Sequence, residues 1–208
     1  MAIEAWLAYV VAATALLLVP GPTVLLVVTY ALSAGRRSAL YTVIGVTLGD
    51  IAAIAMSMAG LGALLAASAT AFTALKWVGA AYLVYLGIRL WRAPASLDDK
   101  VEGAAGSSAR AMLAHAFVVT ALNPKSIVFF VAFLPQFINP HAPVLGQMTL
   151  LGATFVVLAT VIVTGYALLA SGARERIRRP SVLRWMNRAG GGALIAAGVL
   201  TVVWRRAT

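Results

Sequence analysis

The stretch LLLVPGPTVLLVV, residues 16–28, places two prolines and a glycine in the middle of a long apolar run that carries no charge. An apolar run of about 17–25 residues is long enough to cross the roughly 30 Å hydrocarbon core of a bilayer as a helix. A proline inside a helix removes one backbone hydrogen bond and clashes with the turn before it. The run therefore predicts a membrane span at 3–32 whose helix is broken at 20–22.

The overall composition indicates a lipid environment. Of the 208 residues, 62% are hydrophobic and only 11% are charged, whereas soluble domains are about 45–50% apolar and about 25% charged. The net charge of +10 would suit nucleic acid, but the basic residues lie in gaps between apolar runs and not on one face with interleaved aromatics. No cysteine is present, which excludes disulfides and thiolate metal sites. Composition thus favours a membrane protein with no nucleic-acid partner.

A second stretch, ALNPKSIVFFV at 121–131, interrupts an apolar span in the same way. Asn and Gly are favoured as the cap before a helix, and Pro is favoured at its first position. Gly21-Pro22 and Asn123-Pro124 therefore both predict helices that start inside the membrane. The free amides and the dipole at such a start favour an anion. The alternative for either proline is a kink that serves packing alone.

Charged residues and turn-forming segments divide the chain into six expected spans. The polar segment 93–110 holds three of the six acids, and we expect it to be the linker between repeat one, 1–92, and repeat two, 111–208, of a single transmembrane transporter domain, 1–208. Three crossings per half invert the second half, as in many transporters. The sequence thus predicts an all-α polytopic membrane protein of two inverted three-helix repeats, with helices one and four broken. The expected spans are 3–32, 37–66, 74–91, 111–137, 144–173 and 189–204.

The basic residues predict the orientation of the chain. Most of the 16 lie in the connections one-two, three-four and five-six, while loops two-three and four-five hold none. Because cytoplasmic loops carry an excess of Lys and Arg, these three connections are expected in the cytoplasm and both termini outside. Arg205 and Arg206, after the last span, are the exceptions.

Asp50 and Lys125 are the two charged residues expected near the middle of the bilayer. A centrally placed charge costs about 2.5–3.5 kcal/mol on the insertion scale and usually faces a partner or a cavity. One interpretation is a structural salt bridge between the two. The other is a transport site, in which Asp50 binds a proton or the substrate ammonium. In that case Lys125 either adjusts the proton affinity of Asp50 or binds the substrate carboxylate. The sequence leaves both open.

No constellation of catalytic or metal-binding side chains is visible in the spans. HExxH, paired carboxylates and Ser-His-Asp sets are missing, so we expect neither an enzyme nor a metal or cofactor site. The glycines of Gly45-x-x-x-Gly49 are typical of close helix packing, and such small-residue faces are compatible with a homodimer.

Four motifs follow one another in a specific order, and together they resemble the LysE/RhtB family of bacterial amino-acid exporters. The resemblance covers nearly the whole chain. It implies an inner-membrane efflux carrier, a proton antiporter, for amino acids or close derivatives. The motifs are PGP at 20–22, GVTLGD at 45–50, KWVGAAYLVYLGIRLW at 76–91 and NPKSIVFFVAFLPQF at 123–137.

The resemblance also implies a functional core, but it does not name the substrate. Because Asp50 is the only acid in the interior of an expected span, a neutral zwitterion is favoured over Lys or Arg. A membrane protein that transports nothing and assembles with a partner complex is the alternative function. The implied core residues are Pro20, Gly21, Pro22, Gly49, Asp50, Asn123, Pro124 and Lys125.

Overall fold

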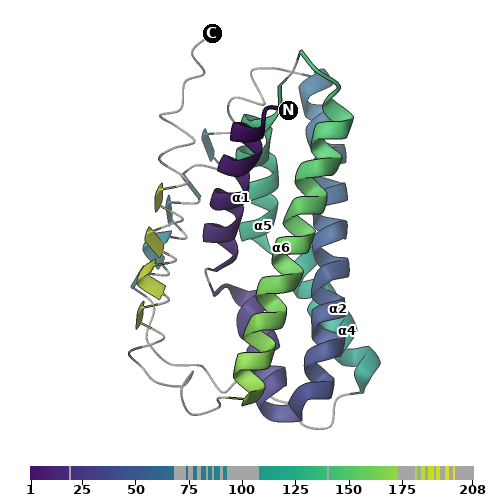
Figure 1. Ribbon diagram of the computed structural model, residues 1–208, viewed down its shortest axis with the longest axis vertical. Coiled ribbons are helices and arrows are strands. Elements are labelled where there is room, and N and C mark those ends of the chain that lie inside the picture. Colours follow the sequence, from purple (N-terminus) through teal and green to yellow (C-terminus); the bar gives the residue numbers. More distant parts are fainter. Residues whose placement is uncertain are drawn as a thin grey trace.

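The computed structural model describes residues 1–18, 20–67, 108–139 and 141–172, together with scattered positions within 74–92 and 181–199. Every secondary-structure element of this described part is helical, and the long helices lie side by side along the long axis of the molecule (Figure 1). The elements are α1 (Ile3–Leu17), α2 (Pro22–Ala67), α4 (Ala109–Ala121), α5 (Pro124–Val128), the π-helix η1 (Phe129–Phe133), the 3-10 helix η2 (Leu134–Phe137) and α6 (Val144–Gly172).

The first span is broken where the prolines predict. Helix α1 ends at Leu17, α2 begins at Pro22, and the axes of Ile3–Leu17 and Pro22–Leu32 differ by 54°. Figure 1 shows α1 in the upper half of the bundle and the first part of α2 below it. The ring of Pro22 fixes φ for the first helical position and needs no amide partner there. The predicted break at 20–22 is confirmed.

A turn at Gly35 reverses the chain between the first and second spans. Gly35 has φ 78°, the one positive φ among the described residues, and glycine alone adopts this without steric cost. The Ser38 hydroxyl binds the carbonyls of Tyr30 and Gly35 at 2.7 and 2.6 Å, which ties the two arms of the turn together. The second span then runs from Arg37 to Gly60.

The fourth span is interrupted at the predicted cap. Helix α4 ends at Ala121, and the Asn123 side chain accepts a hydrogen bond from the amide of Lys125 at 3.1 Å. Pro124 occupies the first position of α5, which continues through η1 and η2 to Phe137. The cap and the proline therefore act here as their local chemistry predicts.

Two clusters of buried side chains hold the bundle together on either side of the breaks. Aromatic residues of α1, η1 and α6 form one cluster, in which the rings of Phe130 and Phe155 meet edge to face at 4.6 Å. Aliphatic residues of α2, α4 and α6, around Val27, Val46 and Val163, form the other.

Four of the six expected spans lie within the described residues. Three helices are long and apolar enough to cross a membrane, at Arg37–Gly60, Ala109–Phe137 and Val144–Ser171, and the bent pair of α1 and the start of α2 is the fourth candidate. The expected spans at 74–91 and 189–204, and the linker at 93–110, fall outside the described residues except for scattered positions and for 108–110. The six-span inverted repeat remains a prediction.

Candidate functional site

The two helix breaks meet in the interior of the bundle. The side-chain amide of Asn123 donates to the hydroxyl of Thr23 at 3.1 Å, and the Thr120 hydroxyl donates to the same oxygen at 3.4 Å. All three side chains are buried. The first turn of α2 and the cap of α5 are thus joined directly, although about a hundred residues separate them in the chain.

Lys125 lies against the end of the first half-helix. Its side chain is only 9% exposed, and Nζ donates to the carbonyl of Leu16 at 3.2 Å. The last carbonyls of a helix carry partial negative charge and have no partner within the helix. The ammonium of Lys125 therefore compensates the carboxyl end of α1.

Gly21 provides the space that Lys125 occupies. A Cβ added at Gly21 would lie 3.2 Å from Nζ and 3.5 Å from Cε of Lys125. Pro20 is buried inside the break, whereas Pro22 and Pro124 are both exposed at the starts of their helices. The PGP motif therefore ends one helix, makes room for a lysine and starts the next helix.

Asp50 is the acidic member of the site. It lies in the second span and is 4% exposed, and its charge and that of Lys125 attract each other. At 1.5 Å per residue, Asp50 is about 20 Å along the helix from Arg37, so it is close to mid-depth. The structure therefore places the two predicted charges in one buried region.

Gly49 brings α2 into backbone contact with α4. A Cβ at this position would lie 2.7 Å from Cβ of Thr120 and 2.8 Å from the carbonyl oxygen of Phe117. Gly45 is equally close to α4, at Leu113 and Ala116. The predicted packing role of these glycines is confirmed, and the close approach positions Asp50 beside the second break.

Three hydroxyl groups of the site escaped the sequence analysis. Thr23 and Thr120 join the breaks, and the Tyr166 hydroxyl of α6 donates to the carbonyl of Leu18 at 2.8 Å. The available signal was a hydroxyl residue within three positions of a proline motif or inside an apolar span, which is too common in membrane helices to single these residues out.

We expect Thr23→Val to destabilise the protein by about 1–3 kcal/mol, because the buried Asn123 amide loses its acceptor while the shape of the side chain is retained. Thermal unfolding in detergent measures the effect. Thr23→Ser, which keeps the hydroxyl, should unfold close to the parent. Thr149→Val is the matched control, since its exposed hydroxyl donates to the carbonyl of Leu145 in its own helix. Equal unfolding of Thr23→Val and Thr149→Val would contradict the role of Thr23.

The chain is similar to known membrane proteins over its length. The sequence model of the LysE type translocator family matches residues 14–204. An uncharacterized membrane protein of Vibrio cholerae is 40% identical over 200 residues, which cover 96% of this chain and 97% of that one. The homoserine/homoserine lactone efflux protein of Salmonella typhimurium is 38% identical over 207 residues, which cover 100% of both chains. The leucine efflux protein of Klebsiella pneumoniae is 30% identical over 141 residues, 68% of this chain and 66% of that one. No solved structure matches the chain.

Proposed function

Because the chain belongs to the LysE type translocator family, we propose that it exports a neutral α-amino acid, with homoserine as the first candidate substrate. The chain is a multi-pass membrane transporter and not an enzyme. The names of two relatives support this substrate class: one is a homoserine/homoserine lactone efflux protein and the other a leucine efflux protein. Both of these amino acids are neutral zwitterions.

The observation that carries the proposal is the pair of opposite charges beside two broken helices. A zwitterion has one ammonium and one carboxylate, and the site offers a group of opposite charge for each. In the proposed complex the carboxylate lies at Lys125 and at the amino end of α2, where the helix dipole favours an anion. The ammonium lies at Asp50. The substrate therefore compensates both buried charges at once.

We further propose that a proton drives export. Asp50 is the one carboxylate among the buried side chains of the described part, so a proton and the substrate ammonium would compete for the same group. The carrier would take up a proton at Asp50 from outside when the amino acid leaves, and would release it inside when the next substrate binds. The two halves would rock against each other to alternate access, as proposed for inverted repeats.

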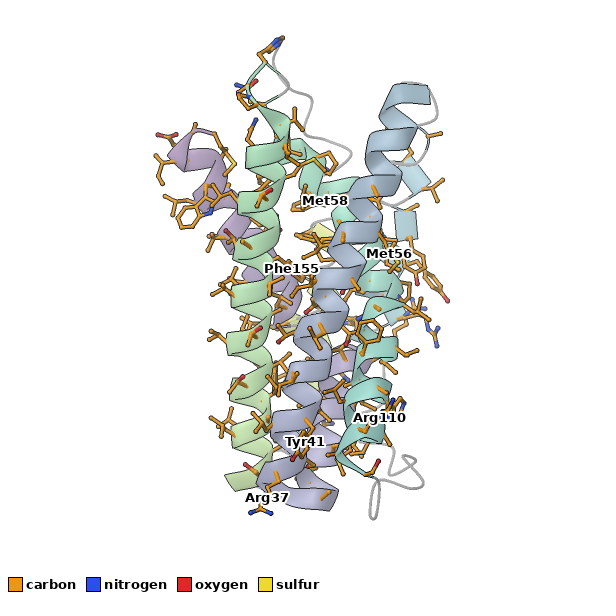
Figure 2. All side chains as sticks on the ribbon, turned by 90° about the vertical axis from the view of Figure 1, so that its right-hand side faces the viewer. Arg37, Tyr41, Met56, Met58, Arg110 and Phe155 are labelled. Atoms are coloured by element: carbon orange, nitrogen blue, oxygen red, sulfur yellow. The ribbon has the colours of Figure 1, made fainter. Side chains whose placement is uncertain are left out.

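The orientation in the membrane is part of the proposal. Figure 2 shows Arg37 and Arg110 at the same, lower end of the bundle. Since basic residues concentrate on the cytoplasmic side, we assign this end to the cytoplasm of the bacterial inner membrane. Export then runs from the Arg37 end toward the end where Gly60 lies.

Efflux from proteoliposomes loaded with labelled homoserine tests the function. We expect efflux faster than that from loaded liposomes without the protein, and we expect an acidic outer buffer to accelerate it. At one proton per substrate, a gradient of one pH unit supplies about 1.36 kcal/mol. It should therefore support about a tenfold ratio of homoserine outside to homoserine inside. If the rate of efflux did not depend on the pH gradient, proton coupling would be refuted and the exporter function would not. No efflux of any neutral amino acid would refute the exporter and favour the partner-complex alternative.

A further inference from the structure

A cavity of about 810 Å³ lies between α2 and the second half of the fourth span. Its walls include Met56, Ser57 and Gly60 of α2, Val131 and Ala132 of η1, and Tyr82. Figure 2 shows Met56 on the side of α2 that faces the teal helices α4 and α5. The volume falls within the range of about 300–1,000 Å³ that is usual for small-ligand pockets.

The cavity begins where the charged site ends. Ala53 and Ser57, which line it, lie one and two turns beyond Asp50 on the same buried stripe of α2. On the opposite wall, Pro124 lines the cavity and directly precedes Lys125. An amino acid whose backbone groups bind Asp50 and Lys125 would therefore have this space directly beside it.

The walls of the cavity are suited to an uncharged side chain. Among the described residues that line it, Ser57 and Tyr82 are the two that carry a polar side-chain group, and both groups are hydroxyls. A charged side chain would find no partner of opposite charge among the described wall residues. Burial of an aliphatic chain would be favourable by about 25 cal/mol for each Å² of apolar surface removed from water. The two hydroxyls offer hydrogen bonds to a side chain such as that of homoserine.

The described helices are closely packed on the other side of Asp50. Gly45 and Gly49 bring α2 against the backbone of α4, and the Tyr30 hydroxyl and Nδ1 of His115 are 3.0 Å apart. The space beside the charges thus opens toward the Gly60 end, which is the outer end in the proposed orientation. A substrate that is leaving the protein would pass through this part.

We propose that the cavity receives the side chain of the exported amino acid. The lack of a side chain at Gly60 leaves this space large enough for leucine, so that the carrier exports apolar amino acids as large as leucine as well as homoserine. This inference rests on the proposed function and deepens it. A Cβ built at Gly60 meets no atom within 4 Å. Because Gly60 lines the cavity, a side chain added there takes up cavity space, and its first carbon meets none of the described residues.

Proteoliposomes loaded with equal amounts of labelled homoserine and leucine test the inference. The parent should export both amino acids. Gly60→Leu should lower leucine export relative to homoserine export by at least about tenfold, the lower end of the discrimination that a single methylene group produces in an apolar pocket. Gly165→Leu in α6 is the matched control, because a Cβ there also meets nothing within 4 Å. It should leave the ratio unchanged.

The outcomes separate this inference from the proposed function. Gly60→Ala adds a single methyl group and should lower the ratio of leucine export to homoserine export by less than Gly60→Leu does. It therefore tests the inference if Gly60→Leu does not fold. The role of the cavity is overturned if the export ratio is unchanged in a folded Gly60 variant, or if the parent exports homoserine but not leucine. Neither result contradicts the proposed exporter function. A parent that exports neither amino acid overturns the proposed function itself.

Discussion

Asp50→Asn is expected to abolish amino-acid export. The variant keeps the shape of the side chain but removes the carboxylate that is proposed to hold the substrate ammonium and the coupling proton. It also removes the attraction between the Asp50 carboxylate and the buried ammonium of Lys125. Breaking a buried charge pair in this way typically costs about 3–5 kcal/mol of stability. Export in proteoliposomes and thermal unfolding in detergent should therefore both be affected.

A double variant separates transport from folding. In Asp50→Asn with Lys125→Met both charges are removed together, and replacing a buried pair by uncharged residues is often neutral or stabilising. We expect the double variant to be more stable than Asp50→Asn alone, to stay below the parent because the Leu16 carbonyl loses the Lys125 ammonium, and to remain inactive. If it regained export, Asp50 and Lys125 would be a structural pair, as the first of the two sequence interpretations holds. Asp50→Asn that exports at the parental rate would remove Asp50 from the mechanism.

The parts of the fold that follow from local chemistry could be predicted from the sequence. Pro22 and Pro124 start helices because their rings fix φ and need no amide partner, and Asn123 caps because its side chain reaches the amide of Lys125. These effects act within a few residues. The positions of both helix breaks therefore follow from local sequence and need no tertiary contact to be predicted.

The remaining features depend on which helices meet. Nothing near Lys125 in the sequence indicates that its ammonium binds the carbonyl of Leu16, or that Tyr166 of α6 binds the carbonyl of Leu18. Both contacts exist because the break in the first span leaves carbonyls that other helices must satisfy in a medium without water. The sequence shows that such partners are needed, but only the packing shows which residues supply them.

Gly49→Ala is expected to destabilise the protein although alanine is the better helix former. The added Cβ would lie 2.8 Å from the Phe117 carbonyl oxygen and 2.7 Å from Cβ of Thr120, and the carbonyl belongs to the backbone of α4. A backbone cannot rotate away as a flexible side chain can, so α2 and α4 must separate. Overpacking of this kind costs about 1–3 kcal/mol and sometimes more, which exceeds the roughly 1 kcal/mol gained from alanine.

The separation of the helices should reach the site as well as the fold. Thr120 is the residue against which Gly49 packs, and its hydroxyl is bound to Thr23 at the start of α2. Moving α4 therefore displaces the junction of the two breaks, and export should fall together with the unfolding temperature in detergent. Gly60→Ala is the matched control on the same helix, because its Cβ meets open space, and it should keep or raise the unfolding temperature. If Gly49→Ala were as stable as Gly60→Ala, the contact between α2 and α4 would be looser than the structure shows, and Gly49 would have to act in some way other than packing.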